Sequence, residues 1–298
     1  MRSFRDASAS EAERLREENR RLRELAYKDP LTNLGNRHAY DESIEEAMKA
    51  VVSSYKRAHE AGLNNHKFAI VVIDMNGLHE ANKRGQEVGD ALLSRLADSI
   101  RDEDKAFRVG GDEFVVILDL STTASDSRSA VSGFIKRINL FFNNTREQGI
   151  EVPSFSVGYA SISEGMETGR DDPKRNERIN VSEEYIRYLR ANGKEVEVGK
   201  DGAVRIGDLF DIIDKSMVER GDESKDIVVY TLKTIAFLRM QEAKKKHYLT
   251  KKLSQLLRIA EAEKGLDNRS GNNASEREKS IYIKDYMNLG ARTTYSRA

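Results

Sequence analysis

An almost unbroken apolar run, FAIVVID at residues 68–74, constrains the fold of this chain more than any other feature of its sequence. A run without polar alternation is typical of a strand that is buried on both faces. The run ends in a single acid, Asp74, at the carboxyl end of the strand, where α/β sheets place their ligands. We therefore expect a buried central strand with a functional acid at its end.

The flanking patterns predict further helices and strands. Apolar spacing and Gly and Pro positions give the following order: helices at 40–61, 78–84 and 90–101, a hairpin around Gly110-Gly111, a helix at 124–147 and a strand at 150–162. Residues 163–207 are polar and are interpreted as an insertion with a helix at 182–191 and a hairpin at 194–206. A helix at 207–220, a strand at 226–231 and a long helix from about 231 to 264 follow.

The N-terminal segment 8–27 reads as a helix with a short heptad pattern. Its apolar seam contains Leu15 and Leu22 at d, with Ala12, Asn19 and Ala26 at a. An Asn at an a position favours a parallel two-stranded register. Two interpretations stay open, a dimerising coiled coil and a solvated single helix.

Composition excludes several function classes. The 50 basic and 50 acidic residues cancel, which argues against a general nucleic-acid binder. The absence of Cys removes disulfides and thiolate chemistry and agrees with a cytoplasmic location. No apolar stretch is long enough to span a membrane, and no phosphate-binding loop or dinucleotide fingerprint occurs.

The pentapeptide from Gly110 to Phe114 carries two acids beside two glycines between hydrophobic strands. Asp and Gly are common in ordinary solvated turns, and that reading stays open for the pentapeptide alone. With Asp74 nearby, the acids would form an oxygen-ligand site for Mg²⁺ and a phosphate substrate. Asn82 and Asp90 could bind the edge of a guanine base, but spacing alone favours Asp90 as the cap of the following helix.

Four motifs in order resemble those of the GGDEF-domain family of diguanylate cyclases. They are DPLTNLGNR, the Asp74-ending strand with the later Asn and Gly-Asp, RVGGDEF, and FSVGYA. The resemblance covers about residues 29–162 and 207–231. It implies an α+β fold, a palm-like and mostly antiparallel sheet flanked by helices. It also implies that two GTP molecules are condensed into cyclic di-GMP and pyrophosphate between two facing protomers, which makes a homodimer the expected state.

The resemblance assigns roles to individual residues. Asp74 and Asp112 would bind Mg²⁺ (or Mn²⁺) together with the main-chain carbonyl of Met75, with Glu113 close by. Asp112 would also accept the proton of the attacking 3′-hydroxyl. Asn82 and Asp90 would bind guanine.

The remaining implied contacts are with phosphate and with product. His79, Gly110, Gly111 and Lys225 stand at substrate-binding positions. Arg101 and Asp104 match the RxxD motif of the product-binding inhibitory site, although Arg101 and Asp104 also fit a simple surface pair at a helix end.

The chain departs from the family pattern at its phosphate contacts. His79 replaces a Lys, Lys83 and Gln86 replace an Asp and a His, and Gly221 and Lys225 stand where a Lys and an Arg are usual. The loop after Asn82 is one residue short. An active cyclase is thus one prediction. One alternative is a degenerate domain that acts as a receptor for GTP or cyclic di-GMP. The other is a structural or assembly protein that keeps the cyclase fold without its activity.

The expected organisation has four parts. They are an N-terminal helix (1–28), a GGDEF domain (29–231) with the insertion (163–207), a C-terminal helix (232–266) and a polar, disordered or partner-ordered tail (267–298). An unidentified protein partner would bind the C-terminal helix or the insertion.

Overall fold

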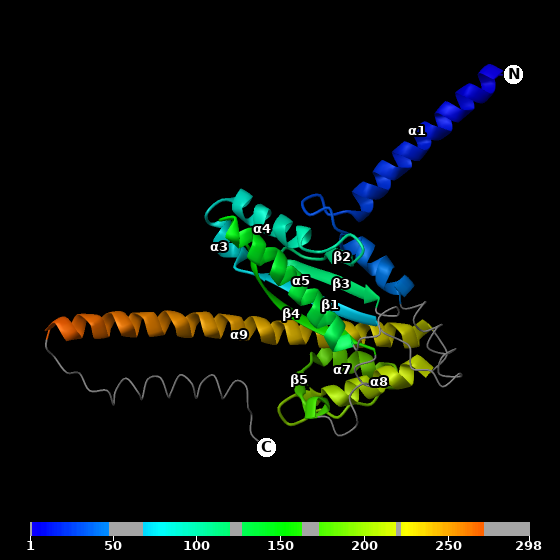
Figure 1. Cartoon of the computed structure of the whole chain (residues 1–298). Helices are drawn as coiled ribbons and strands as arrows, with labels where there is room; N and C mark the ends of the chain where they lie inside the picture. The colour runs from blue at the N-terminus through cyan, green and yellow to red at the C-terminus, as the bar shows by residue number, and fades with distance from the viewer. Residues whose placement is uncertain (1, 48–67, 120–126, 163–172, 219–221, 271–298) are drawn as a thin grey trace. The chain divides into compact units, whose positions relative to one another are not determined.

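The computed structural model describes residues 2–47, 68–119, 127–162, 173–218 and 222–270. The chain divides into two units, Met1–Gln241 and Glu242–Ala298. The sheet, the helices packed on it and the buried cores described in this subsection lie in the first unit. The N-terminal helix α1 spans Arg2–Tyr27, which confirms a helix there (Figure 1). Leu15 and Leu22 on it are exposed, and whether they pair with a second helix stays a prediction.

A four-stranded antiparallel sheet forms the centre of this unit (Figure 1). Its strands lie in the order β2 (Lys105–Arg108), β3 (Glu113–Asp119), β1 (Phe68–Asn76) and β4 (Ser154–Ser161). The predicted apolar run is the central strand β1, which pairs with β3 on one side and β4 on the other. The fold is therefore α+β with a mostly antiparallel sheet, as expected.

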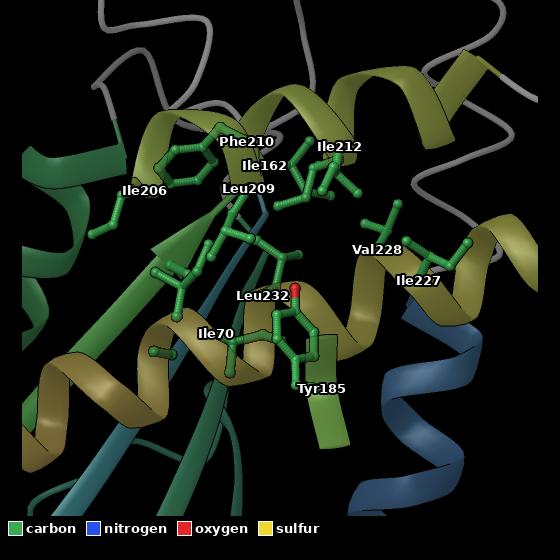
Figure 2. Close-up of a cluster of buried hydrophobic side chains, with 14 of the residues drawn as sticks. Ile70, Ile162, Tyr185, Ile206, Leu209, Phe210, Ile212, Ile227, Val228 and Leu232 are labelled. Carbon is green, nitrogen blue, oxygen red and sulfur yellow. The ribbon is translucent and has the colours of Figure 1, made fainter. Parts of the chain in front are cut away.

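Alternation along β1 sends successive side chains into two separate cores. Val71 and Ile73 enter the core formed with α4 (Gln86–Asp98) and α5 (Ser127–Glu147). Ile70 and Val72 enter the second core, built with the helical residues 37–47 and with three further helices. These are α7 (Glu183–Ala191), α8 (Ile206–Val218) and α9 (Asp222–Ser270). Figure 2 shows Ile70 in this second core beside Leu232 of α9 and Tyr185 of α7.

Two expectations about local structure are wrong. The strand expected at 226–231 is helical, because α9 runs without a break from Asp222 to Ser270. The β-branched residues of this segment have strand propensity. Ile227, Val228, Leu232 and Ile235 are nevertheless buried at the spacing of a helix. The α9 helix therefore continues through residue 231, where the GGDEF domain was expected to end.

The hairpin expected at 194–206 forms in part. The antiparallel bridge Val198↔Val204 and the hydrogen bond from the Gly199 amide to the Ala203 carbonyl at 2.9 Å join its two halves. Its second half, strand β6 (Ala203–Arg205), also pairs with β5 (Arg178–Asn180), which the sequence did not predict. The helix expected at 90–101 begins earlier, at Gln86. Gly85 is its N-cap residue, so Asp90 lies inside α4 and does not cap it.

The remaining helices agree with the patterns where they are described. Residues 37–47 are helical, and the rest of the helix expected at 40–61 lies outside the described residues. Ser182 caps α7 by accepting a hydrogen bond from the Tyr185 amide, and α8 covers most of the expected 207–220. A short 3₁₀ turn spans Pro173–Asn176, and α3 spans Leu78–Asn82. Of the polar tail expected at 267–298, residues 267–270 belong to α9, and residues 271–298 lie outside the described residues. No helix among the described residues is both long enough and apolar enough to cross a membrane.

Gly158 of the FSVGYA motif allows α9 to approach the sheet. A methyl group at Gly158 would overlap the main chain of α9 at Ala236 and Met240. Arg239 donates to the Tyr159 carbonyl at 2.8 Å and fastens the same turn of the helix. The contact is thus between two backbones, which only glycine permits.

We predict that Gly158→Ala lowers the free energy of unfolding by about 1–3 kcal/mol, because rigid main chain cannot move aside. Gly133→Ala is the matched control: it lies within α5 with no atom near the added methyl group. The control should be neutral or stabilise by up to about 1 kcal/mol. Urea denaturation of both variants measures the difference, and equal stabilities would contradict the close packing.

Candidate functional site

The acid at the end of β1 lies directly opposite an acid of β3. Asp74 pairs in register with Glu113, and the Met75 amide donates to the Asp112 carbonyl at 2.9 Å. Because that bond marks a hydrogen-bonded rung, Asp74 and Glu113 form the adjacent non-hydrogen-bonded pair, in which side chains approach closely. Asp74 is 1% exposed, whereas Asp112 and Glu113 are partly exposed. The register thus places Asp74 beside the acidic turn, as the sequence predicts.

The Gly110-Gly111 turn is held by its own backbone. The amides of Val109 and Gly110 donate to the Glu113 carbonyl at 2.9 and 3.3 Å. A methyl group on Gly110 would lie 3.1 Å from a Glu113 carboxylate oxygen, whereas one on Gly111 would meet nothing within 4 Å. Gly110 therefore lets the Glu113 side chain fold against the turn, and Gly111 leaves open space over it.

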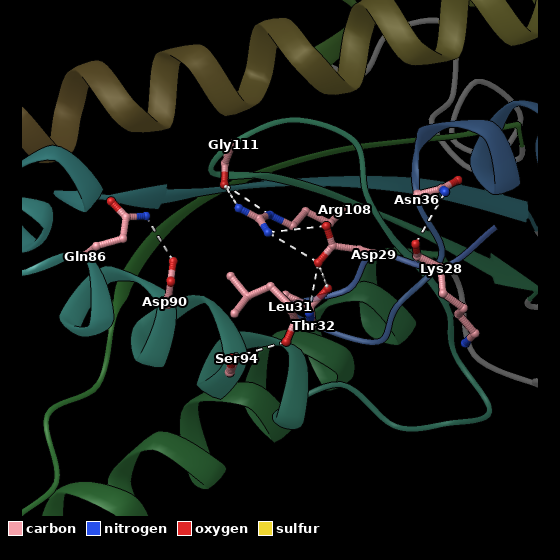
Figure 3. Close-up of polar contacts among 10 residues, drawn as sticks. All are labelled: Lys28, Asp29, Leu31, Thr32, Asn36, Gln86, Asp90, Ser94, Arg108 and Gly111. Atoms are coloured by element: carbon pink, nitrogen blue, oxygen red, sulfur yellow. Dashed lines mark hydrogen bonds and ion pairs between the residues drawn. The ribbon is translucent and has the colours of Figure 1, made fainter. Parts of the chain in front are cut away.

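Arg108 joins this turn to the DPLT segment (Figure 3). Its guanidinium donates to the Gly111 carbonyl at 2.8 and 3.2 Å and to the two carboxylate oxygens of Asp29 at 3.3 Å each. The Arg108 and Asp29 side chains are only 15% and 17% exposed. Asp29 is itself fixed, because the Thr32 amide and hydroxyl donate to its Oδ1 at 2.8 and 2.7 Å.

Burial raises the pKa of Asp29, but the Thr32 hydrogen bonds and Arg108 together outweigh it and leave that pKa below its ordinary value. The carboxylate is therefore charged at neutral pH and holds Arg108. Our sequence analysis quoted both segments as motifs but gave Asp29 and Arg108 no role.

Gly35 of the same segment extends the sheet edge. Its amide donates to the Ala106 carbonyl at 3.1 Å, and its carbonyl accepts from the Arg108 amide at 2.8 Å. A methyl group there would overlap the Phe107 ring. The segment thus holds Arg108 by main-chain as well as side-chain contacts.

A buried polar pair lies beside Asp74. Ser156, the β4 partner of Asp74, donates from its hydroxyl to Asn76 Oδ1 at 3.0 Å, and both side chains are less than 10% exposed. By alternation, Asn76, Asp74 and Ser156 share one face of the sheet. Sequence reasoning missed Ser156, although its place in FSVGYA was visible.

The two expected guanine-binding residues flank the α3–α4 junction. Asn82 ends α3, and its Oδ1 is buried against Gly89, where a methyl group would overlap it. Among the described residues this oxygen has no hydrogen-bond partner. Asp90 accepts from Gln86 Nε2 at 3.2 Å (Figure 3). An unfilled acceptor and a partly exposed carboxylate suit the N–H groups of a base edge.

The expected phosphate contacts are less complete. His79 is exposed on α3, Lys225 is half-buried near the start of α9, and Gly221 lies outside the described residues. Lys83 is exposed, but Arg84 binds Glu151 through both nitrogens at 3.0 and 2.8 Å. Arg84 therefore has another partner and does not replace a missing phosphate contact in this structure.

The expected inhibitory pair has a third member. Arg101 is exposed, and the Asp104 amide donates to its carbonyl at 3.1 Å. Arg137 of α5 donates to Asp104 Oδ2 at 3.4 Å. Sequence reasoning missed Arg137 because it lies 33 residues further along the chain. The Arg137 guanidinium thus lies beside the Asp104 carboxylate, and Arg101 contacts Asp104 through the backbone.

Metal binding would depend on oxygen donors alone. Across the described ranges, no three His, Cys, Asp or Glu side chains converge to form a metal cluster. Asp74 and Asp112 could supply carboxylate oxygens and Met75 a carbonyl, a donor set that fits a hard cation whose other ligands come from substrate or water.

Comparison with known proteins gives the family. The diguanylate cyclase GGDEF domain model matches residues 26–179, which is more than half of the chain. The chain therefore belongs to the GGDEF-domain family, and the resemblance drawn from its motifs is confirmed.

Several curated proteins are similar over part of their length. Diguanylate cyclase DgcS of Shewanella oneidensis is 38% identical over 95 residues, 30% of this chain and 29% of that protein. An uncharacterised protein from the hutH 5′ region of Streptomyces griseus is 31% identical over 208 residues, 67% of this chain and 76% of that protein. The bifunctional cyclase/phosphodiesterase MucR of Pseudomonas aeruginosa is 31% identical over 147 residues. The chain spans only 20% of MucR and 29% of DgcS.

Among solved structures, the coiled coil and GGDEF domain of DgcB from Caulobacter crescentus, bound to c-di-GMP, aligns with a TM-score of 0.41. The alignment has 22% sequence identity and covers 64% of this chain and 94% of that one.

We predict that Arg108→Ala lowers the free energy of unfolding at pH 7 by about 1–3 kcal/mol, because the Gly111 carbonyl and Asp29 lose a shared donor. Arg108→Lys is the matched control and should lose less free energy of unfolding. Lysine keeps the positive charge but lacks the planar guanidinium that binds two partners at once. The pKa of Asp29 is lowered in the folded state. The stability that the Arg108–Asp29 contact contributes is therefore present above about pH 4, and it declines as the pH falls through the folded pKa of Asp29. Denaturation from pH 7 to pH 3 tests this, and a pH-independent difference would contradict the Asp29 contribution.

Proposed function

We propose that this chain is a diguanylate cyclase that converts two GTP molecules into cyclic di-GMP and two pyrophosphates. The observation that carries the proposal is the register of β1 and β3, which sets buried Asp74 opposite Glu113 and next to Asp112. Three acids at one end of a sheet, beside a glycine turn with open space, suit a triphosphate and its counter-ions. The cyclase relatives support this class of reaction.

Asp112 is proposed to start the chemistry. Its carboxylate takes the proton of a 3′-hydroxyl, whose oxygen then attacks the α-phosphorus of the facing GTP. A new phosphodiester bond forms, the bond from the α-phosphorus to the bridging oxygen breaks, and pyrophosphate leaves with that electron pair. The same step in the opposite direction closes the ring.

Mg²⁺ or Mn²⁺ is proposed to bind Asp74, Asp112 and the Met75 carbonyl. A bound divalent cation would neutralise phosphate charge and lower the pKa of the attacking hydroxyl. Burial of Asp74 and the Met75–Asp112 backbone bond keep these donors in place. His79, Lys225 and the open Gly110-Gly111 turn are proposed to contact the triphosphate.

The base is proposed to be guanine. Asp90 can accept from both guanine N1–H and the exocyclic amine, while the buried Asn82 Oδ1 needs a donor that the described residues do not provide. Adenine presents an acceptor at N1 and only its exocyclic amine as a donor on that edge, so it offers these oxygens fewer donors than guanine does. GTP rather than ATP is therefore the proposed substrate, which agrees with a cytoplasmic enzyme.

Two copies of the chain are proposed to bring two GTP molecules together. Leu15 and Leu22 of the apolar seam are exposed on α1, at 48% and 57%. Pairing this seam with a second copy would bury it and raise the local concentration of the facing site.

The expected test is product formation from GTP and Mg²⁺ by nucleotide-free protein, identified by mass spectrometry. Asp112→Ala should reduce the rate by on the order of 100-fold or more, the scale of removing a key charged group. Asp98→Ala is the matched control, because Asp98 is an exposed acid at the end of α4. No cyclic di-GMP from the wild type at high protein and GTP concentration would contradict the proposal. Nucleotide binding without product would favour the receptor alternative.

Arg101, Asp104 and Arg137 are proposed to bind the product and inhibit the enzyme. We expect Arg101→Ala to raise the concentration of cyclic di-GMP needed for half-inhibition about tenfold or more. The substitution removes an exposed guanidinium that could bind the product through two hydrogen bonds. Initial rates with added cyclic di-GMP measure this. Unchanged inhibition in Arg101→Ala and Arg137→Ala would exclude the site.

A further inference from the structure

The junction between α3 and α4 connects the two guanine-binding residues through very few backbone contacts. Three residues, 83–85, separate Asn82 at the end of α3 from the start of α4 at Gln86. The junction's own hydrogen bonds are short-range: Arg84 and Gly85 donate to Ala81 and Asn82 at 2.9 and 3.2 Å. Since α3 has only five residues, it has little stability of its own.

A distant residue, Glu151, holds this junction from outside. Its two carboxylate oxygens accept from Arg84 Nη1 and Nη2 at 3.0 and 2.8 Å, which makes the pair bidentate. Its main-chain carbonyl accepts from Arg95 Nη1 of α4 at 2.9 Å. We call these three residues the Glu151 clasp. It joins the junction and α4 to the segment that leads into β4, 67 and 56 residues further along the chain.

Charge makes the clasp persistent at neutral pH. The hydrogen bond from Arg84 is the largest influence on the Glu151 carboxyl and lowers its pKa, and the same contact raises the pKa of Arg84. Both groups are therefore ionised wherever the protein is folded near pH 7. The pair is about half exposed, at 52% and 51%, so its contribution to global stability is small.

The clasp acts where small displacements matter. Asn82 and Asp90 must face the same base edge, and the path from 83 to 85 sets their separation. Gly85 has φ 147°, a conformation that a side chain would rarely adopt, so the junction follows an unusual path. Arg84 fixes that path at one point, and Arg95 fixes α4 one turn beyond Asp90.

We propose that Glu151 is a positioning residue for the guanine site: it holds Arg84 and Arg95 so that Asn82 and Asp90 keep the spacing that a guanine base requires. This inference rests on the proposed function, since it takes GTP as the substrate. It assigns Glu151 no contact with substrate. It also gives Arg84 a role other than phosphate binding.

The experiment compares the wild type with Glu151→Gln, Arg84→Gln and the double variant. Each single change should raise KM for GTP about two- to fivefold, the size of one exposed ion pair, with kcat within about twofold. The double variant should raise KM no more than either single variant, because one interaction is lost in all three. Asp201→Asn is the matched control, since it breaks the similarly exposed Arg178–Asp201 pair between β5 and the turn before β6.

Hydrogen exchange of the nucleotide-free protein supplies a second readout. Amides 82–90 should exchange faster in the Glu151 and Arg84 variants than in the wild type and the control. Unchanged exchange there, or KM effects that multiply in the double variant, would overturn the proposal. If calorimetry finds no GTP binding to the wild type, the proposed function fails and the guanine role of the clasp fails with it. GTP binding with unchanged exchange rejects the clasp alone.

Discussion

The guanidinium of Arg108 is the contact on which the acidic turn depends. It binds the Gly111 carbonyl inside the turn and the Asp29 carboxylate in the segment that precedes the first helix of the domain. Gly110 and Gly111 have little conformational preference of their own. Backbone bonds to the Glu113 carbonyl and from Met75 to Asp112 hold the turn to β3 and β1, and Arg108 links Gly111 to the Asp29 segment as well.

The sheet supplies the other half of this arrangement. Because side chains alternate along β1, one strand holds two cores together and still presents Asp74 and Asn76 at its end. The second core depends on α9, whose main chain approaches β4 at Gly158, two residues beyond Ser156. The polar end of the sheet is thus held by ordinary packing on both faces. Figure 2 shows aliphatic and aromatic side chains of the second core, among them Ile70, Leu209 and Phe210.

Local patterns predicted the parts of this site that lie within single segments. The run to Asp74, the glycine turn and the N-terminal helix all have periodicities or turn residues that can be recognised alone. Contacts between distant segments could not be found that way. Arg108–Asp29, Arg137–Asp104 and Arg84–Glu151 join residues between 33 and 79 positions apart. The strand expected at 226–231 failed for a related reason, since burial against the core selected a helix for residues with strand propensity.

The most direct test of the account is to locate the metal. We would soak crystals of the full chain with Mn²⁺ and the α,β-methylene analogue of GTP, whose bridge cannot be cleaved, and measure anomalous scattering. The account predicts a Mn²⁺ peak within coordination distance of Asp74 and Asp112, with the guanine between Asn82 and Asp90. A nucleotide bound only at Arg101 and Asp104, or Mn²⁺ away from Asp74, would contradict it.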